Sequence, residues 1–340
     1  MFHRILNKIL FQKFLDIIER SLWRDYAKHD YIFEENWDVL IILDAGRYDI
    51  FAKLHETLLN KIGRLEYRIS YGPPTERYIK GNFLRAKVIK HLNNIVYISA
   101  NPVTDIALGK YKKCFYKYLP VWKFSRTEEF VATFPEDVSY YALKTYLRIP
   151  KDKKLIIHFL QPHHPPIGKK YGYLAKHIKA DMSRLFRKSL YREANKEPLP
   201  NHITRGFNKL YYVFLPMITR GMITDSVYYL NMGKHYTLSD LVRGYIENYV
   251  IVLLSVKELL QIFPGRIVVT SDHGEAFGEY AHKMLPLRVY GHPNRIRIEG
   301  LVKVPWLVVE NTISYEESMR KAIRRIIRYR LMQRNANRVI

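Results

Sequence analysis

An apolar run that ends abruptly on Asp272 and His273 constrains the fold of this chain more than any other feature. Ile267, Val268 and Val269 are consecutive β-branched residues, and their unbroken pattern predicts a strand buried on both faces of a parallel sheet. In open α/β sheets, ligands bind just beyond the carboxyl ends of such strands. A carboxylate and an imidazole before a glycine turn suit a divalent cation, although a strand-to-helix turn capped by the aspartate is the alternative.

A second strand end of the same kind lies upstream. Residues 39–43 form a short apolar run that ends on Asp44. Because the carboxyl ends of parallel strands meet at one edge of a sheet, the carboxylates of Asp44 and Asp272 are expected to lie close together, where they repel unless a cation lies between them. The alternative is that Asp44 caps a helix over residues 47–59. The two strand ends together favour a metal site.

The string Thr-Ser-Asp-His-Gly-Glu at residues 270–275, followed by Phe-Gly-Glu at residues 277–279, resembles the signature of the alkaline phosphatase superfamily. The resemblance is to its sulfatase and phosphoethanolamine or lipoteichoic-acid transferase branch. It implies an α/β fold, an α/β/α sandwich with a mostly parallel central sheet and a helical insertion. It also implies that Asp44, Asp272 and His273 hold the metal, and that a hydroxyl or a modified cysteine nearby is the nucleophile.

The resemblance implies a nucleophile on the turn after the next strand, which we expect over residues 66–70. Thr75 follows Pro74 at the expected start of a helix, where free N–H groups can hold phosphate oxygens. We predict that Thr75 binds the metal and attacks phosphorus to form a covalent intermediate. Thr75 could instead be only a helix cap, and Ser70 is the reserve nucleophile.

Sulfatases use a Cys/Ser-x-Pro-x-Arg motif, in which the first residue is converted to formylglycine. The sequence lacks this motif, and its one cysteine, Cys114, has no following proline and arginine. Phosphorus chemistry is therefore favoured over sulfate-ester hydrolysis.

A third apolar run, residues 154–160, leads into His163 and His164, which are expected to join the same site. In the superfamily a His-Pro motif at this point contacts the substrate or a second metal. Two-metal members carry an aspartate four residues before a histidine, whereas Gln161 precedes Pro165 here, so the second metal stays open. Two neighbouring histidines in a loop could also be solvated surface.

His292 lies in a Tyr-Gly-His-Pro string that resembles the Gly-His element after the Asp-His signature. We expect His292, with His164, to orient the substrate or the leaving group, by binding a second cation or acting as general acid. His282 is the competing candidate, but the glycine and proline beside His292 match better. Arg47 could bind a substrate anion or belong to the second metal site, although an arginine in the first turn of a helix is more often solvated or salt-bridged.

The chain has 340 residues, 48% of them hydrophobic, enough for one large α/β core with an inserted subdomain. One cysteine excludes a disulfide framework. We expect an N-terminal amphipathic helical segment over residues 1–35, a catalytic core over 36–168 and 237–312, a basic helical insertion over 169–236, and a basic C-terminal helix over 313–340.

Positive charge is unevenly spread along the chain. The formal net charge is +24; residues 169–220 hold 12 Lys/Arg against three acidic residues, and the tail from residue 320 holds 8 with none. Such segments attract polyanions. The sequence carries no nucleic-acid fold signature, so an anionic membrane surface is favoured over nucleic acid, with solvated arginines as the alternative. It assigns no oligomeric state.

The first 15 residues are interrupted by charges too often for a signal peptide or a spanning helix. We therefore expect a cytoplasmic protein, or a peripheral one on the cytoplasmic face of the membrane.

These features predict a metal-dependent hydrolase or transferase that acts on phosphate esters or phosphodiesters, with an anionic glycan or lipid headgroup as substrate. Zinc or manganese suits the mixed oxygen and nitrogen ligands better than calcium. The alternatives are a sulfatase-like sulfuric ester hydrolase and, in another class, a catalytically inactive scaffold that binds membranes or polyanions.

Overall fold

A seven-stranded sheet forms the centre of the computed structural model, which describes residues 26–125, 132–178, 221–224, 226–283 and 285–336. The strand order is β2-β10-β7-β1-β5-β3-β4, and only β10 runs antiparallel to its neighbours. The prediction of a mostly parallel central sheet is confirmed. The strands are β1 (Val39–Asp44), β2 (Arg64–Ile69), β3 (Ile95–Ser99), β4 (Lys117–Pro120), β5 (Lys154–Pro162), β7 (Gly265–Ser271) and β10 (Lys303–Asn311).

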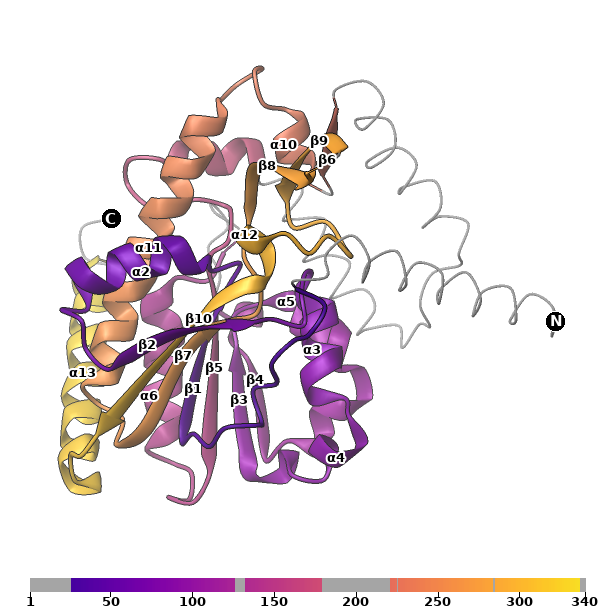
Figure 1. The fold of residues 1–340 in the computed structure, drawn as a ribbon. Coiled ribbons are helices and arrows are strands. Elements are labelled where there is room, and N and C mark those ends of the chain that lie inside the picture. The colour runs from indigo at the N-terminus through magenta and orange to yellow at the C-terminus, as the bar shows by residue number, and fades with distance from the viewer. Residues whose placement is uncertain (1–25, 126–131, 179–220, 225, 284, 337–340) are drawn as a thin grey trace.

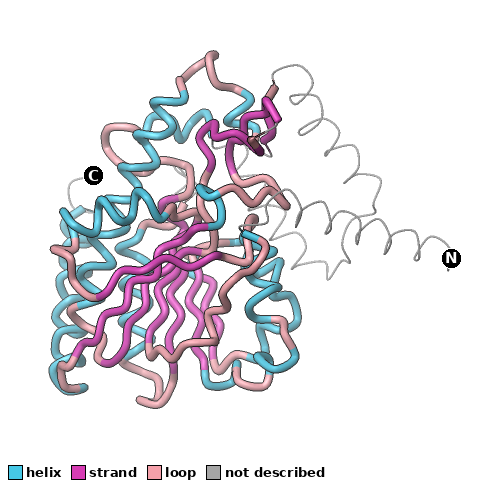
Figure 2. Tube along the Cα trace, in the orientation of Figure 1, coloured by secondary structure: helices cyan, strands magenta, loops and turns pink. Residues whose placement is uncertain are grey.

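Helices cover both faces of this sheet (Figure 1, Figure 2). One face packs against α2 (Tyr48–Leu58), α6 (Pro135–Tyr146) and α11 (Leu238–Leu260), with α13 (Tyr315–Ala336) outside α6. The other face is covered by α3 (Thr75–Phe83), α4 (Ala86–Ile89) and α5 (Pro102–Leu108). Short 3₁₀ helices lie at Leu92–Asn94, Gly109–Cys114, Val121–Lys123 and Gly172–Leu174.

Strand β1 shows why its sequence is apolar without alternation. Ile41 and Leu43 belong to the core cluster that includes the buried residues of α6 and α11, whereas Leu40 and Ile42 belong to the cluster beneath α3. Every residue of β1 is buried. A central parallel strand covered by helices on both sides has no solvent face, so both side-chain rows are apolar.

A second, three-stranded sheet lies beyond the edge of the large sheet where its parallel strands end (Figure 1). It consists of β6 (Met222–Thr224), β9 (Leu285–Gly291) and β8 (Ala276–His282), with the short helices α10 (Val227–Leu230) and α12 (Glu299–Val302) beside it. The seven strands of the large sheet all fall within residues 36–168 and 237–312. The expected helical insertion contributes strand β6, which pairs with β9, so its described part is not helical alone.

Parts of the sequence expectations fall outside the described residues. These include the amphipathic helix to residue 25 and most of the basic stretch, residues 179–220. Residues 26–35 form turns and loops, while α13 coincides with the expected C-terminal helix. Among the helices that the structure describes, none has the length and apolar character needed to cross a bilayer.

Candidate active site

Polar residues from neighbouring strand ends meet at the carboxyl edge of the large sheet. Asp44 is the last residue of β1, and Asp272 directly follows β7. Because β7 pairs with β1 in parallel, the backbones carrying these two aspartates end side by side. The turns after β2, β3 and β5 lead to Thr75, Asn101 and His163 at the same edge. This is the ligand-binding edge of an open α/β sheet.

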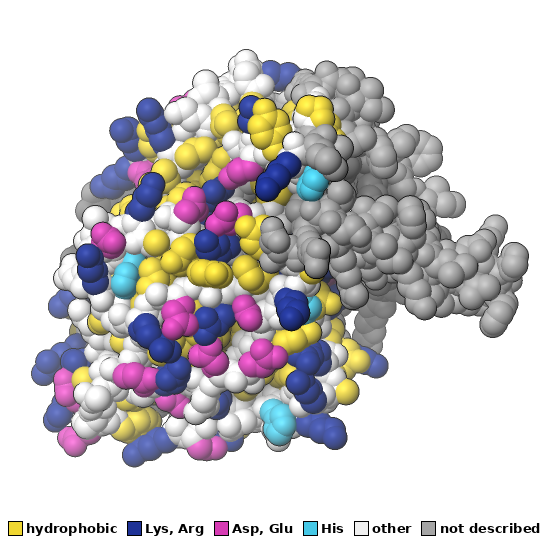
Figure 3. Space-filling view, in the orientation of Figure 1, with side chains coloured by type: hydrophobic (Ala, Val, Ile, Leu, Met, Phe, Trp, Pro, Cys, Tyr) yellow, Lys and Arg dark blue, Asp and Glu magenta, His cyan; other side chains and the backbone are white. Residues whose placement is uncertain are grey.

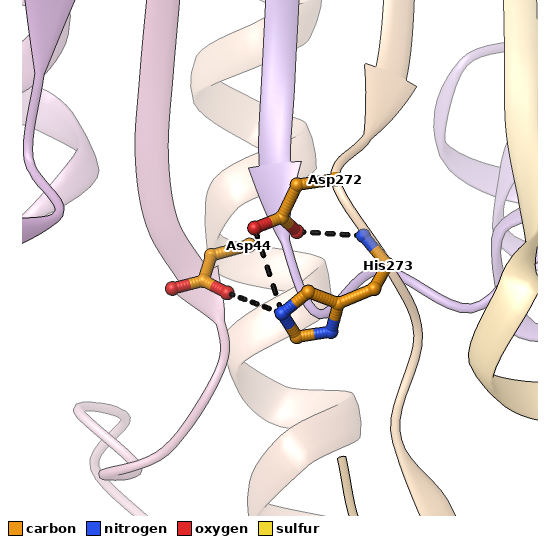
Figure 4. A group of neighbouring side chains, drawn as sticks. All are labelled: Asp44, Asp272 and His273. Atoms are coloured by element: carbon orange, nitrogen blue, oxygen red, sulfur yellow. Dashed lines mark hydrogen bonds and ion pairs between the residues drawn. The ribbon is translucent and has the colours of Figure 1, made fainter. Parts of the chain in front are cut away.

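Asp44, Asp272 and His273 form a compact group in which one potential ligand atom from each residue lies within 4.8 Å of the others (Figure 4). Nε2 of His273 is 3.7 Å from Oδ1 of Asp44 and 3.5 Å from Oδ2 of Asp272. All three side chains are buried. The structure thus brings the three predicted metal ligands together.

Backbone groups fix the orientation of this group. Oδ1 of Asp272 accepts hydrogen bonds from the backbone N–H of Ala45 (3.0 Å) and of His273 (2.8 Å). Nδ1 of His273 lies 2.8 Å from the carbonyl oxygen of Gly274, which leaves Nε2 facing the carboxylates. A Cβ on Gly274 would lie 2.0 Å from the carbonyl oxygen of Gly300, so the glycine is needed for close backbone approach.

Burial and like charge act together on the two aspartates. Burial raises the pKa of Asp44 well above its usual value, and the neighbouring charge of Asp272 raises it further. Burial also opposes ionisation of Asp272, but the charges of His273 and His158 and a hydrogen bond from Thr75 lower its pKa overall. The raised pKa of Asp44 indicates that the surrounding protein groups do not offset a second negative charge at this position. The donor set of two carboxylates, an imidazole and a hydroxyl therefore fits a divalent cation.

The hydroxyl of Thr75 lies inside this group. Its Oγ1 is 2.7 Å from Oδ2 of Asp272, 3.3 Å from Nε2 of His273 and 3.5 Å from Oδ1 of Asp44. Thr75 is the first residue of α3, and the N-cap position belongs to Pro74, so the threonine is not the helix cap. Its hydroxyl faces the carboxylate of Asp272 and the imidazole of His273.

Ser70, the reserve nucleophile, has a different role. Its buried hydroxyl donates to the carbonyl oxygen of Asp272 and accepts from the backbone N–H of Gly72 at 3.1 Å. Ser70 therefore ties the end of β2 to the turn after β7.

Asn101 belongs to the site although the sequence analysis did not include it. Its Nδ2 donates to Oδ2 of Asp44 at 2.7 Å and lies 3.4 Å from Oγ1 of Thr75. Its Oδ1 accepts from the backbone N–H of Val103 (2.7 Å), so the side chain also caps α5. An Asn-Pro pair just after the apolar run of β3 was the available signal.

His292 packs against His273 of the metal group. Its ring centroid is 4.8 Å from that of His273 and 5.0 Å from that of His163, and its side chain is 14% exposed. Nδ1 of His292 is 2.8 Å from Oε2 of the buried Glu275. The other oxygen of Glu275 accepts from the hydroxyls of Tyr228 (3.2 Å) and Tyr229 (2.8 Å).

These contacts set the charge of the carboxylate and the histidines. Burial opposes ionisation of Glu275, but His292 lowers its pKa below the usual value. Burial lowers the pKa of His163 to about 3, with the charge of His292 acting in the same direction. Burial likewise lowers the pKa of His164 to about 4. His163 and His164 are therefore neutral at pH 7.

His164 is fully buried, with its ring centroid 5.1 Å from that of Tyr228, and neither ring nitrogen has a hydrogen-bond partner within the described residues. The loop that carries it is held by Asn248 of α11. Nδ2 of Asn248 donates to the carbonyl oxygens of His163 and Pro165, both at 3.0 Å, and Oδ1 accepts from the N–H of Ile167 at 2.9 Å. The two histidines thus lie on an anchored turn and not on a solvated loop.

His282, the competing candidate, lies away from the metal group. In the β8–β9 hairpin Ala276 pairs with Gly291, which puts His292 at the site, whereas His282 pairs with Leu285 at the opposite end. The two ends are six positions apart along β8, or about 20 Å.

The guanidinium of Arg47 contacts acidic groups of its own neighbourhood. It donates to both oxygens of Asp49 (2.9 and 2.8 Å), to Glu279 and to the carbonyl oxygen of Glu275 (2.9 Å). Burial opposes its charge, but Asp49 and Glu279 raise the pKa of Arg47 above its usual value. In this arrangement Arg47 joins the turn after β1 to strand β8.

No protein-family model and no curated protein matches this sequence. Similar solved structures include the integral membrane lipooligosaccharide phosphoethanolamine transferase A from Neisseria meningitidis, with 14% identity and a TM-score of 0.46, over 79% of this chain and 47% of that one. The chain spans about half the length of that protein.

The phosphonate monoester hydrolase of Agrobacterium radiobacter is similar at 13% identity and a TM-score of 0.43, over 83% of this chain and 68% of that one. A protein from Vibrio parahaemolyticus is similar at 11% identity and a TM-score of 0.37, over 82% of this chain and 61% of that one. That protein is a member of the alkaline phosphatase superfamily. Residues 270–279 of this sequence resemble the signature of the same superfamily.

Proposed function

We propose that the chain is an enzyme of the alkaline phosphatase superfamily that transfers phosphoryl groups from phosphate esters or phosphodiesters to water or to an acceptor hydroxyl. The observation that carries this proposal is the position of Thr75. Its hydroxyl is 2.7 Å from Asp272, 3.3 Å from His273 and 3.5 Å from Asp44, at the N-terminus of the nine-residue helix α3. A hydroxyl among metal ligands and free helical N–H groups suits attack on phosphorus.

Asp44, Asp272, His273 and Thr75 would hold the cation, with zinc or manganese matching the oxygen and nitrogen donors. When bound, the cation lowers the pKa of the hydroxyl and offsets negative charge that develops on the phosphoryl oxygens. The protein contributes the geometry: Asp272 orients the hydroxyl of Thr75, and Asn101 holds Asp44 in place by a 2.7 Å hydrogen bond.

In the proposed reaction Thr75 first releases its hydroxyl proton to solvent and stays deprotonated between turnovers; its oxygen attacks phosphorus, and the bond from phosphorus to the leaving oxygen breaks. His292, held by Glu275 at 2.8 Å, gives a proton to that oxygen, and the buried His164 packs against Tyr228, which donates to the same Glu275. The product of this step is Thr75 esterified through phosphorus, which still carries the second ester group when the substrate is a phosphodiester. Water or an acceptor hydroxyl then attacks phosphorus and releases Thr75, with His292 taking up the proton of the incoming group.

We further propose an anionic substrate, such as a phosphorylated glycan or lipid headgroup at a membrane surface. The net charge of +24 favours encounter with polyanions. Figure 3 shows basic side chains scattered among acidic ones on one face of the described part, not gathered in one patch. We therefore propose that residues of the active site, and not a basic surface patch, determine which substrate binds.

The test is to measure bound metal, together with turnover of bis(p-nitrophenyl) phosphate and p-nitrophenyl sulfate. Asp272→Ala should lose both metal and turnover. Thr75→Ala should keep most of the metal and lose turnover by about 10³-fold or more, since the nucleophile is gone. Thr75→Ser should retain part of the activity, and mass spectrometry of wild type acid-quenched during turnover of the phosphodiester should find a p-nitrophenylphosphoryl group on Thr75.

Thr57→Ala is the matched control, because Thr57 is an exposed threonine of α2. It should behave as wild type. Unchanged turnover in Thr75→Ala would reject the threonine mechanism. Turnover of the sulfate ester alone would favour a sulfatase, and a metal-free, inactive wild type would favour the scaffold.

A further inference from the structure

His158 is a buried histidine that the proposed reaction does not use. It lies in the middle of β5, where it pairs with Ile42 of β1 and Ser99 of β3, and it is 0% exposed. Its Nε2 points toward the metal group and is 3.9 Å from Oδ2 of Asp272. Within the described residues this nitrogen has no hydrogen-bond partner. A buried ring nitrogen without a partner loses its hydration without compensation, so its placement calls for a reason.

The other ring nitrogen of His158 is already engaged. Nδ1 is 2.8 Å from the hydroxyl of Tyr97, which is also 0% exposed. The ring of Tyr97 packs against Phe115 and Phe83, with centroid distances of 5.4 and 5.5 Å. These contacts hold the tyrosine, and through it the imidazole, in one orientation.

Asp272 has room for one more donor on the side that faces His158. Its Oδ1 accepts from the N–H groups of Ala45 and His273, whereas Oδ2 has, in the part of the chain that the structure describes, only Thr75 within hydrogen-bond distance. A carboxylate oxygen that binds a cation through one lone pair can accept a hydrogen bond through another.

The charge of this carboxylate decides where the proton of His158 sits. A proton on Nε2 faces Asp272 and is attracted by its negative charge, whereas a bare Nε2 would present a lone pair to it. With the proton on Nε2, Nδ1 accepts a hydrogen bond from the hydroxyl of Tyr97. The contact with Tyr97, whose hydroxyl can donate, is compatible with the tautomer that donates toward the metal site.

We propose that Tyr97 and His158 are positioning residues of the metal site, in which the Nε2–H of His158, 3.9 Å from Oδ2 of Asp272 in this structure, comes within hydrogen-bond distance of that oxygen in the metal-loaded protein and aims this ligand at the cation. The inference rests on the proposed function, because it assumes that Asp272 binds a metal. Outer hydrogen-bond partners of this kind orient metal ligands, and their loss typically weakens metal binding by about 10- to 100-fold.

The experiment uses the full chain and measures Zn²⁺ affinity by competition with a chromophoric chelator, together with the visible absorption spectrum of the Co²⁺-loaded protein. His158→Phe removes the donor and keeps a ring in the core. It should weaken Zn²⁺ binding by about 10- to 100-fold and shift the Co²⁺ bands. Tyr97→Phe removes one oxygen and should weaken binding in the same direction by a smaller factor. The double variant should bind as His158→Phe does, because Tyr97 acts through His158.

Ile156→Val is the matched control, since Ile156 is a buried residue of β5 in the same core cluster as Tyr97. It should leave the affinity and the spectrum unchanged. A folded His158→Phe with wild-type Zn²⁺ affinity would overturn the inference, as would complete loss of binding in His158→Phe beside an unaffected Tyr97→Phe, which marks a direct ligand. If His158→Phe does not fold, the Zn²⁺ affinity of Tyr97→Phe is the test: weaker binding supports the inference, and wild-type affinity overturns it. Failure of the wild type to bind Zn²⁺ or Mn²⁺ would instead reject the proposed function.

Discussion

At the scale of single residues, Asn101 contacts both a proposed metal ligand and the proposed nucleophile. Its amide nitrogen contacts Asp44 at 2.7 Å and lies 3.4 Å from the hydroxyl of Thr75, so one side chain sets the spacing of a ligand and the nucleophile. We expect Asn101→Ala to lower kcat by about 10²-fold, because a shift of about 1 Å in a reacting group can cost that much. Steady-state kinetics with bis(p-nitrophenyl) phosphate measures this loss.

Asn93→Ala is a suitable control for that measurement, because Asn93 is exposed in the 3₁₀ helix Leu92–Asn94. A kcat for Asn101→Ala within twofold of wild type would show that Asn101 does not set this spacing.

The sequence was sufficient to predict the residues that follow apolar runs directly. Asp44, Asp272 and His273 do so, and parallel pairing then brings them together. Asn101 and His158 were not predicted as site residues. Asn101 carries the sequence pattern of an ordinary helix cap, and His158 lies inside an apolar strand, where only the register of β5 against β1 shows that it reaches Asp272.

At the scale of elements, α11 contributes the side-chain amide of Asn248 to hold the histidine loop. Asn248 donates to the carbonyl oxygens of His163 and Pro165 and accepts from the N–H of Ile167. We expect Asn248→Leu to destabilise the fold by about 2–3 kcal/mol, because buried backbone groups lose their partners. Urea denaturation measures this difference in the free energy of unfolding.

Asn248→Asp separates the two functions of this side chain. It keeps an acceptor for Ile167 but places a carboxylate oxygen against the carbonyl oxygens, so it should be at least as destabilising as Asn248→Leu. Wild-type stability of both variants would mean that the loop is anchored by other contacts.

The elements of the core were more predictable than those above it. Residues 154–160 lie in β5, the helix expected over residues 47–59 is α2, and the tail is α13. The three-stranded sheet was not predicted, because β8 and β9 include exposed residues such as Tyr280 and β6 has only three residues. The antiparallel direction of β10 could not be predicted from the sequence either, because an apolar run does not indicate which way a strand runs in the sheet.

At the scale of the whole molecule, stability should depend on protons and on the metal together. Burial is the main cause that lowers the pKa of His29, His158 and His164 to about 4, from 6.5. Between pH 6.5 and 4 the unfolded chain therefore binds protons that the folded chain does not, so the metal-free protein should lose stability as the pH falls through this window. The raised pKa of Asp44 acts in the opposite direction, because protonation relieves its repulsion from Asp272.

Thermal denaturation of the metal-free protein at pH 7.5, 6.5, 5.5 and 4.5 measures the balance, and we expect Tm to fall steadily. Added Zn²⁺ at about 100 times its Kd should stabilise the protein by about 2.7 kcal/mol near neutral pH. This gain should shrink in acid as protons compete for the ligands. Asp272→Ala should show no gain from zinc, and a wild type whose Tm ignores both zinc and pH would contradict the prediction.

Strand β10 has a consequence for synthesis of the protein on the ribosome. Among the described residues it is the last strand in sequence, and within them β2 pairs with the large sheet only through it. β2 leads to the turn before Thr75, whereas Asp44 and Asp272 lie at the ends of β1 and β7, which pair directly. A nascent chain that has not yet released β10 can align the two aspartates but has no sheet partner to hold β2 in place. A chain that ends before β10 therefore lacks the sheet partner of the strand that leads to the nucleophile.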